Sequence, residues 1–232
     1  MSRLVATLLA FGPLALVACV DTGDEGMYVV NNTAIEGDAC TLAGTPDQPF
    51  LSHGVINAKS PVPYLLHPLI KSRIQSIDGV DDESKTIQLR SADITLTMKA
   101  ITIGTTTTPS SANLGSFSAL FAGPVPPNGT VNVGVDLIPT STLRAIEGMG
   151  GTDFNAEVVA SIVIKGELNG DEVKSQPYVF PVSVCDKCVV RNVGACPMLG
   201  TPRTGNACNP FQDGTVDCCD MGGTLVCPAT TM

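Results

Sequence analysis

The stretch AEVVASIVIKGELNGDEVKSQPYVFPVSV, residues 156–184, decides the fold class of this chain. Two runs rich in Val, Ile, Phe and Tyr flank Asn169-Gly170, a pair preferred in the tight type I′ turn between antiparallel strands. The stretch therefore predicts a β-hairpin. Pro177 and Pro181 place parts of the second run at a sheet edge or a bulge, because proline cannot donate a ladder hydrogen bond.

The same strand pattern recurs upstream in ADITLTMKAITIG, residues 92–104, where small or apolar residues alternate with polar ones. This period of two is typical of a strand with one buried face. Further strands are expected at 86–89, 116–121 and 130–137, and one short helix at 139–147. We therefore expect an all-β protein, with an antiparallel β-sandwich of immunoglobulin-like or related topology over residues 40–184.

The first residues, MSRLVATLLAFGPLALVAC, have the shape of a secretory signal peptide, in which Arg3 precedes an apolar run at 4–16. The run is shorter than the roughly 20 residues that a membrane-spanning helix needs. It ends in Leu16-Val17-Ala18-Cys19, which resembles the bacterial lipobox. This resemblance implies a signal peptide over 1–18 and a lipid-anchored Cys19. An ordinary secretion signal with a chance cysteine is the alternative.

The segment after the lipobox, 19–39, is acidic and rich in Gly and Asn. We expect it to be a lipidated cysteine followed by a tether, although a first strand at 27–30 is an alternative that would shorten the tether.

Composition restricts the partners of the chain. Its formal net charge of −9 disfavours nucleic acid, whose phosphates it would repel. With no Trp and only three Tyr, the chain is poor in the aromatic platforms that sugar-binding sites use. We expect contact with a membrane through the lipid anchor, and a protein or surface-glycan partner.

Besides Cys19, eight of the nine cysteines are disulfide candidates, because exported thiols are usually oxidised. They are Cys40, Cys185, Cys188, Cys196, Cys208, Cys218, Cys219 and Cys227. Seven of them lie in residues 185–232, a segment with too few apolar residues to bury a core by itself. We therefore expect a disulfide-stapled C-terminal tail.

The odd number of cysteines in this tail predicts one bridge to a cysteine outside it. Cys40 is the only partner available, and we expect it to pair with Cys185 or Cys188. The adjacent Cys218 and Cys219 are expected to pair with different partners. Two alternatives compete with this interpretation of Cys185-x-x-Cys188: a zinc site completed by other tail cysteines, and a thioredoxin-like redox pair. No metal site or cofactor is expected.

Motifs for catalysis are missing from the sequence. It has only two histidines, His53 and His67, and the second lies beside Pro68 among apolar residues, which favours a structural role. No G-x-S-x-G or H-E-x-x-H motif occurs. We therefore expect a protein that is not an enzyme.

The lipobox, the acidic β-rich middle and the tail CNPFQDGTVDCCDMGGTLVCP together resemble predicted cell-surface lipoproteins of myxobacteria-like bacteria. That resemblance implies an outer-membrane or cell-surface location and assigns no activity. We expect a lipid-anchored envelope protein that binds a partner or has a structural role. A surface adhesion or carbohydrate-binding module is the alternative.

Overall fold

The structure is a computed structural model, and it describes residues 26–35, 39–42, 45–76, 82–198 and 200–227. In these residues the chain is all-β, with one α-helix and one 3₁₀ turn at Asp82–Lys85, so the predicted fold class is confirmed. The predicted signal peptide and Cys19 lie outside the described residues. No helix in the described part of the chain is long and apolar enough to cross a membrane.

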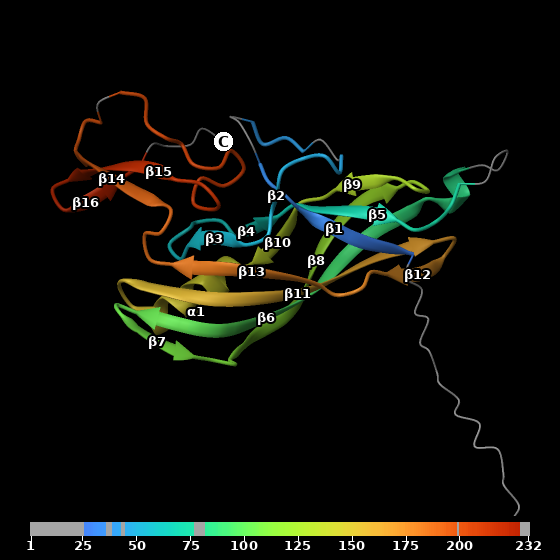
Figure 1. The fold of residues 1–232 in the computed structure, drawn as a ribbon, viewed down its shortest axis with the longest axis horizontal. Coiled ribbons are helices and arrows are strands. Elements are labelled where there is room, and N and C mark those ends of the chain that lie inside the picture. The colour runs from blue at the N-terminus through green and yellow to red at the C-terminus, as the bar shows by residue number, and fades with distance from the viewer. Residues whose placement is uncertain (1–25, 36–38, 43–44, 77–81, 199, 228–232) are drawn as a thin grey trace, which may run out of the picture.

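The largest sheet has the strand order β3-β13-β11-β6-β7, with β8 also paired to β6 and β12 to β11 (Figure 1). Its strands are β3 (Gly54–Asn57), β6 (Ile87–Ile103), β7 (Thr106–Pro109), β8 (Asn113–Val125), β11 (Phe154–Leu168), β12 (Asp171–Lys174) and β13 (Tyr178–Cys185). All the pairs are antiparallel except β13–β3, which is parallel and departs from the predicted pattern.

Two smaller sheets pack beside the large one. They have the orders β2-β1-β5-β9 and β10-β4. Their strands are β1 (Met27–Thr33), β2 (Phe50–Leu51), β4 (Tyr64–Leu66), β5 (Pro68–Ser72), β9 (Thr130–Asn132) and β10 (Val135–Ile138). The tether prediction is wrong for β1, because this strand pairs on both sides and buries Met27 completely. The alternative of a first strand at this position is the one observed.

The predicted hairpin is confirmed. β11 and β12 pair in register up to Leu168 opposite Asp171. Asn169 and Gly170 connect them with φ angles of 54° and 91°, the two positive values that a type I′ turn requires. Pro181 pairs with β11 only, one residue before β3 joins β13. Its missing N–H therefore costs no ladder hydrogen bond.

The predicted short helix is α1 (Thr140–Gly150), which connects β10 to β11. It buries Leu143 and Ile146 and ends at Gly151, whose φ of 69° favours glycine. The Arg144 guanidinium donates hydrogen bonds to the carbonyl oxygens of Ala58, Lys59 and Ser60 at 2.9, 3.2 and 3.3 Å. The helix thereby fixes the connection between β3 and β4.

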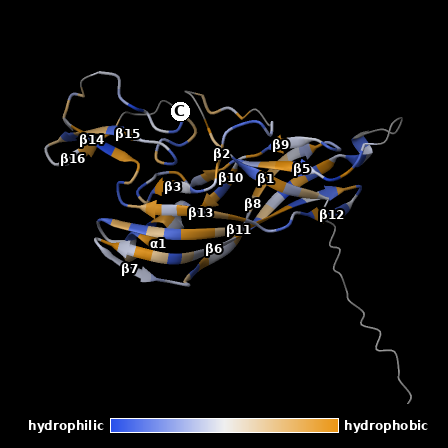
Figure 2. Cartoon of the chain, viewed as in Figure 1, coloured by the Kyte–Doolittle hydropathy of each residue, from blue (hydrophilic) through white to orange (hydrophobic). Residues whose placement is uncertain are grey.

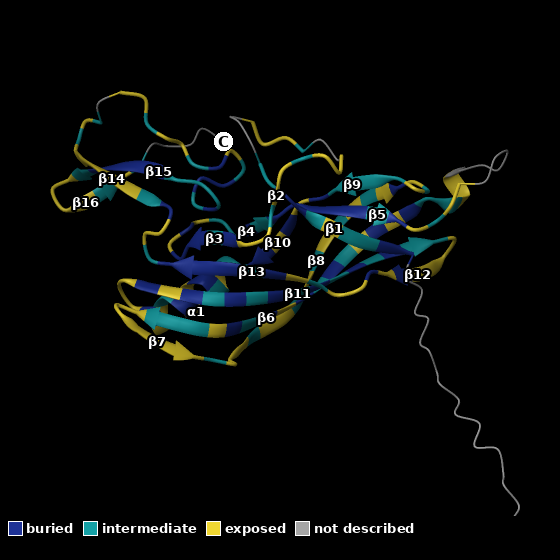
Figure 3. Ribbon diagram, in the orientation of Figure 1, coloured by how far each residue is buried: buried dark blue, intermediate teal, exposed yellow. Residues whose placement is uncertain are grey.

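One hydrophobic core takes side chains from all three sheets and from α1. The alternation predicted for residues 92–104 holds as far as Met98, because Ala92, Ile94, Leu96 and Met98 are all buried; a bulge after Met98 shifts the register, and Ala100 is only half-buried. Figure 2 shows the matching alternation of apolar and polar residues along β6 and β11, and Figure 3 shows burial concentrated on β11 and β13. The arrangement is sandwich-like; an immunoglobulin-like topology remains a prediction.

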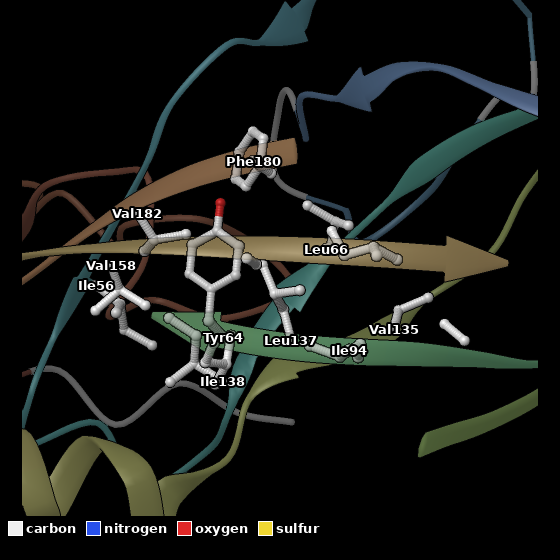
Figure 4. Close-up of a cluster of buried hydrophobic side chains, with 14 of the residues drawn as sticks. Ile56, Tyr64, Leu66, Ile94, Val135, Leu137, Ile138, Val158, Phe180 and Val182 are labelled. Atoms are coloured by element: carbon white, nitrogen blue, oxygen red, sulfur yellow. The ribbon is translucent and has the colours of Figure 1, made fainter. Parts of the chain in front are cut away.

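Tyr64 lies within this core, between Phe180 and the apolar side chains of β4 and β10 (Figure 4). Its ring passes so close to Gly54 that a Cβ there would collide with it. A glycine is therefore required at the start of β3.

Candidate functional site

All eight cysteines beyond Cys19 form disulfides with one another. The pairs are Cys40–Cys208, Cys185–Cys188, Cys196–Cys219 and Cys218–Cys227. Cys40 does bond to the tail, as the odd cysteine count required, and Cys218 and Cys219 do reach different partners. The predicted partner of Cys40 was wrong, because Cys185 and Cys188 bond each other.

Two of these disulfides fasten a small tail sheet of strand order β14-β15-β16. Its strands are β14 (Val190–Ala195), β15 (Val216–Met221) and β16 (Thr224–Val226), seen apart from the larger sheets in Figure 1. In this sheet, Asp217 accepts two hydrogen bonds from Arg191, at 2.7 and 2.8 Å, and one from the backbone N–H of Arg203. The Arg191 guanidinium and that N–H lower the pKa of Asp217 to about 2.

The tail segment 209–213, NPFQD, docks against β3 and β4 through hydrogen bonds. The Gln212 amide accepts from Leu65 N–H at 2.8 Å and donates to Leu65 O at 2.9 Å, as a neighbouring strand would. Asn57 N–H donates to Phe211 O, and Asp213 N–H donates to Val55 O. Nothing in the local sequence pattern predicted this docking, because it depends on amide side chains that meet distant backbone groups.

Asp213 is the charged end of the docked segment. Its carboxylate accepts hydrogen bonds at 2.7 Å from both the Tyr64 hydroxyl and Val55 N–H. Burial raises the pKa of Asp213 in spite of these donors. Burial, followed by the adjacent Asp213, raises the pKa of Tyr64 well above its usual value. The hydrogen bond between Tyr64 and Asp213 therefore joins the tail to a side chain of the hydrophobic core.

A second polar cluster lies on the large sheet and contains His53, Glu157 and Ser183. The Ser183 hydroxyl donates to Glu157 Oε1 at 2.6 Å and lies 3.2 Å from His53 Nε2. Glu157 Oε2 lies 3.4 Å from the same Nε2. In a hydrolase triad the acid binds the other ring nitrogen and orients the base. Here the serine and the acid share one nitrogen, so the cluster lacks that relay geometry.

His67 has the structural position expected from its sequence neighbours. It is buried between β4 and β5, and its backbone N–H donates to Asn32 Oδ1 at 2.8 Å. Burial lowers the pKa of His67 to about 4. The imidazole is therefore neutral at physiological pH.

A metal centre finds no support in the described part of the chain, where no group of three or more His, Cys, Asp or Glu side chains could hold an ion. The cysteines invoked for the zinc alternative are all joined in disulfides.

The outer edge of β8 is a candidate surface for binding another polypeptide. β8 pairs with β6 along one side, and no strand in the described residues pairs with its other side. None of its 13 residues is charged, although charged side chains commonly protect sheet edges. Leu120 is 85% exposed there.

Beside this edge lies an open groove of about 510 Å³ between β8 and β10. Phe117 and Leu120 line it from β8, Pro63 and Pro139 from nearby loops, and Asp136 from β10. The groove presents both apolar and polar side chains and one carboxylate, which suits an extended segment that carries apolar residues and a basic residue.

Comparisons with known proteins give no family. No family model matches the chain, and no curated protein matches it. A solved protein from Archaeoglobus fulgidus is 13% identical with a TM-score of 0.32, covering 56% of this chain and 89% of that one. Spo0M, a sporulation control protein from Bacillus subtilis, is 12% identical with a TM-score of 0.28. That match covers 68% of this chain and 49% of Spo0M. Likeness at this level carries no argument about function.

Proposed function

We propose that the protein is a lipid-anchored protein of the bacterial cell envelope, held at the outer membrane or cell surface through Cys19, which binds a partner rather than catalysing a reaction. The observation that carries the proposal is the cysteine inventory. The chain has nine cysteines, and four disulfides use eight of them, which leaves Cys19 alone without a cysteine partner in the chain. A thiol spared from disulfides, at the end of a lipobox-like quartet, is available for the thioether bond.

The location has independent support at a coarser level. Four disulfides in one chain indicate a non-cytoplasmic location, because reducing systems keep cytoplasmic thiols reduced.

The anchor can be tested with Cys19→Ser, which changes no disulfide. In a bacterial host that processes lipoproteins, wild-type protein should enter the detergent phase of Triton X-114 and show an acylated N-terminus by mass spectrometry. The variant should lose both properties. Unchanged detergent partitioning of the variant would contradict the anchor. A dimer seen only under oxidising conditions would instead assign Cys19 to an intermolecular disulfide.

Partner binding is proposed to use the β8 edge and its groove, which can add an extended segment as a further strand. A photo-crosslinking residue in place of Ala119 should capture a polypeptide on the native cell surface. Leu120→Lys should abolish this capture, whereas Val179→Lys, at a 59% exposed position on β13, should preserve it. Equal capture by both lysine variants would rule out the β8 edge.

The glycan-binding alternative requires exposed aromatic rings, and two of the three tyrosines offer little exposed surface. Tyr64 is completely buried, so it cannot form an aromatic platform. Tyr178 is half-buried and stacks on Phe180 with ring centroids 6.3 Å apart, so little of its face is available to a sugar.

A further inference from the structure

The Cys185–Cys188 disulfide differs from the other three in the short loop that it closes. Its cysteines are three residues apart, whereas the other pairs are separated by 9, 23 and 168 residues. A short loop restricts the unfolded chain least, so this bond adds least to the stability of the fold. Reduction of Cys185–Cys188 should therefore lower the free energy of unfolding less than reduction of any of the other three disulfides.

The two sulfurs also differ in access. Cys185, the last residue of β13, is 3% exposed, whereas Cys188 is exposed at the start of the tail. A thiolate from another molecule can therefore approach Cys188 and displace Cys185 as the leaving group. Attack on an accessible sulfur is the usual first step of thiol–disulfide exchange.

A groove of about 450 Å³ adjoins Lys187, the residue before Cys188, between the loop after β3 and the tail sheet; the cysteine in its lining is Cys227. Its apolar lining includes Val190, Phe211 and Leu225, and two lysines, Lys59 and Lys187, stand at its side. Such a groove can seat the segment that flanks a partner's cysteine.

Two lysine ammonium groups lie at the same corner as the disulfide. Lys59 and Lys187 lie 3.0 and 3.6 Å from the oxygens of Asp186, a buried carboxylate between the two cysteines. With Asp153, whose backbone N–H donates to Asp186 at 3.3 Å, the two cations meet two anions, so this corner is formally neutral in a chain of net charge −9. Nearby positive charge stabilises an attacking or departing thiolate.

The fold can also accommodate the two thiols that form when this disulfide is reduced. Both sulfurs lie near the Ile56 carbonyl oxygen, at 3.5 Å for Cys185 and 3.7 Å for Cys188. Once reduced, the buried Cys185 thiol can donate a hydrogen bond to that oxygen. The corner stays fixed by backbone bonds, because Ala58 N–H donates to Cys185 O and Asp186 N–H donates to Phe154 O.

We propose that Cys185–Cys188 is a thiol–disulfide exchange site that accepts two electrons from an extracytoplasmic protein dithiol while the rest of the fold stays intact. A donor thiolate attacks the Cys188 sulfur, the Cys185–Cys188 bond breaks, and the Cys185 thiolate takes up a proton. The second donor thiolate then attacks the mixed disulfide and releases the Cys188 thiolate, which is protonated in turn. The donor ends as a disulfide and the chain as a dithiol. The site does not depend on the lipid anchor.

Stepwise reduction tests the proposal on the wild-type protein. The purified chain is incubated with increasing dithiothreitol at neutral pH, alkylated, and mapped by mass spectrometry. Cys185 and Cys188 should be labelled together at a dithiol concentration at least tenfold below that needed by the other six cysteines, with unchanged circular dichroism. The Cys40–Cys208 bond is the internal comparison, because Cys40 is also exposed. The proposal is wrong if another pair opens first, or if this pair opens only with loss of structure.

Single variants test the assigned direction of attack. Cys185→Ser leaves the exposed Cys188 thiol, which should form a mixed disulfide with oxidised glutathione at least tenfold faster than the buried Cys185 thiol left by Cys188→Ser. Equal rates would contradict attack at Cys188. The wild-type titration still decides the proposal if either variant fails to fold.

Discussion

Replacing Gln212 with alanine should lower the free energy of unfolding by about 3 kcal/mol. The Gln212 side chain is 1% exposed and supplies partners for both backbone groups of Leu65 on β4. Alanine leaves that N–H and carbonyl without protein partners. An unsatisfied polar group costs roughly 1–3 kcal/mol, and Leu65 is only half-buried, so about 1.5 kcal/mol is expected for each group.

Urea denaturation of the disulfide-intact protein measures this loss. For a chain of this size, about 3 kcal/mol moves the unfolding midpoint by roughly 1 M. Gln212→Met should lose about as much as Gln212→Ala, because methionine keeps the volume but not the hydrogen bonds. Gln88→Ala on the exposed side of β6 is the matched control and should change stability by less than about 0.5 kcal/mol. If both Gln212 variants unfold at the wild-type midpoint, the hydrogen bonds from the Gln212 amide to the Leu65 backbone do not stabilise the fold.

Three further predictions concern pH and packing. Because burial lowers the pKa of His67 to about 4, folded protein resists its protonation. The His67 contribution to stability is complete above pH 6.5 and falls by about 3 kcal/mol as pH drops to 4; His67→Gln should remove this contribution in pH-dependent urea titrations, while the shifted carboxyl groups of Asp213 and Asp217 keep theirs. Arg191→Lys loses the paired hydrogen bonds and should raise the pKa of Asp217 from about 2 towards 3.8, measured by carboxyl ¹³C NMR titration; an unchanged value would contradict the cause assigned to it. Gly54→Ala forces a Cβ into a buried ring and should cost about 1–3 kcal/mol, whereas Gly134→Ala, with open space around it, should cost little; equal thermal unfolding temperatures would refute the clash.

Local patterns in the sequence predicted the hairpin strands, most of β6 and the turn, whereas the strand expected at 130–137 divides into β9 and β10, which lie in different sheets. The alternation of 92–98, the Asn169-Gly170 turn and the short helix all have causes within a few residues, and the structure reproduces each. One strand was misjudged as mostly tether, because β1 is short and follows an acidic segment while its stability comes from burying Met27 between distant strands.

The cysteine pairing shows where sequence reasoning stops. Parity required a bond from Cys40 to the tail, but the choice of partner depends on which tail cysteine the folded chain brings within reach. Docking of 209–213 on β3 and β4 brings Cys208 to Cys40, with Cα atoms 4.7 Å apart. That docking uses Asn209 and Gln212 amides, which in the sequence look like any polar loop residues.

The docked segment 209–213 has a consequence for the order in which the chain is completed. A polypeptide emerges from the ribosome, and from any export channel, with its N-terminal residues first. β3 and β4 therefore appear more than 140 residues before the amide and carboxylate groups that satisfy their backbone, as the separations of 147 and 158 residues indicate. Until then β3 and β4 present open hydrogen-bonding groups, and Cys40 lacks its disulfide partner Cys208. A chain truncated before residue 209 would lack the groups that pair with β3 and β4, so these strands can close only after the tail has been delivered.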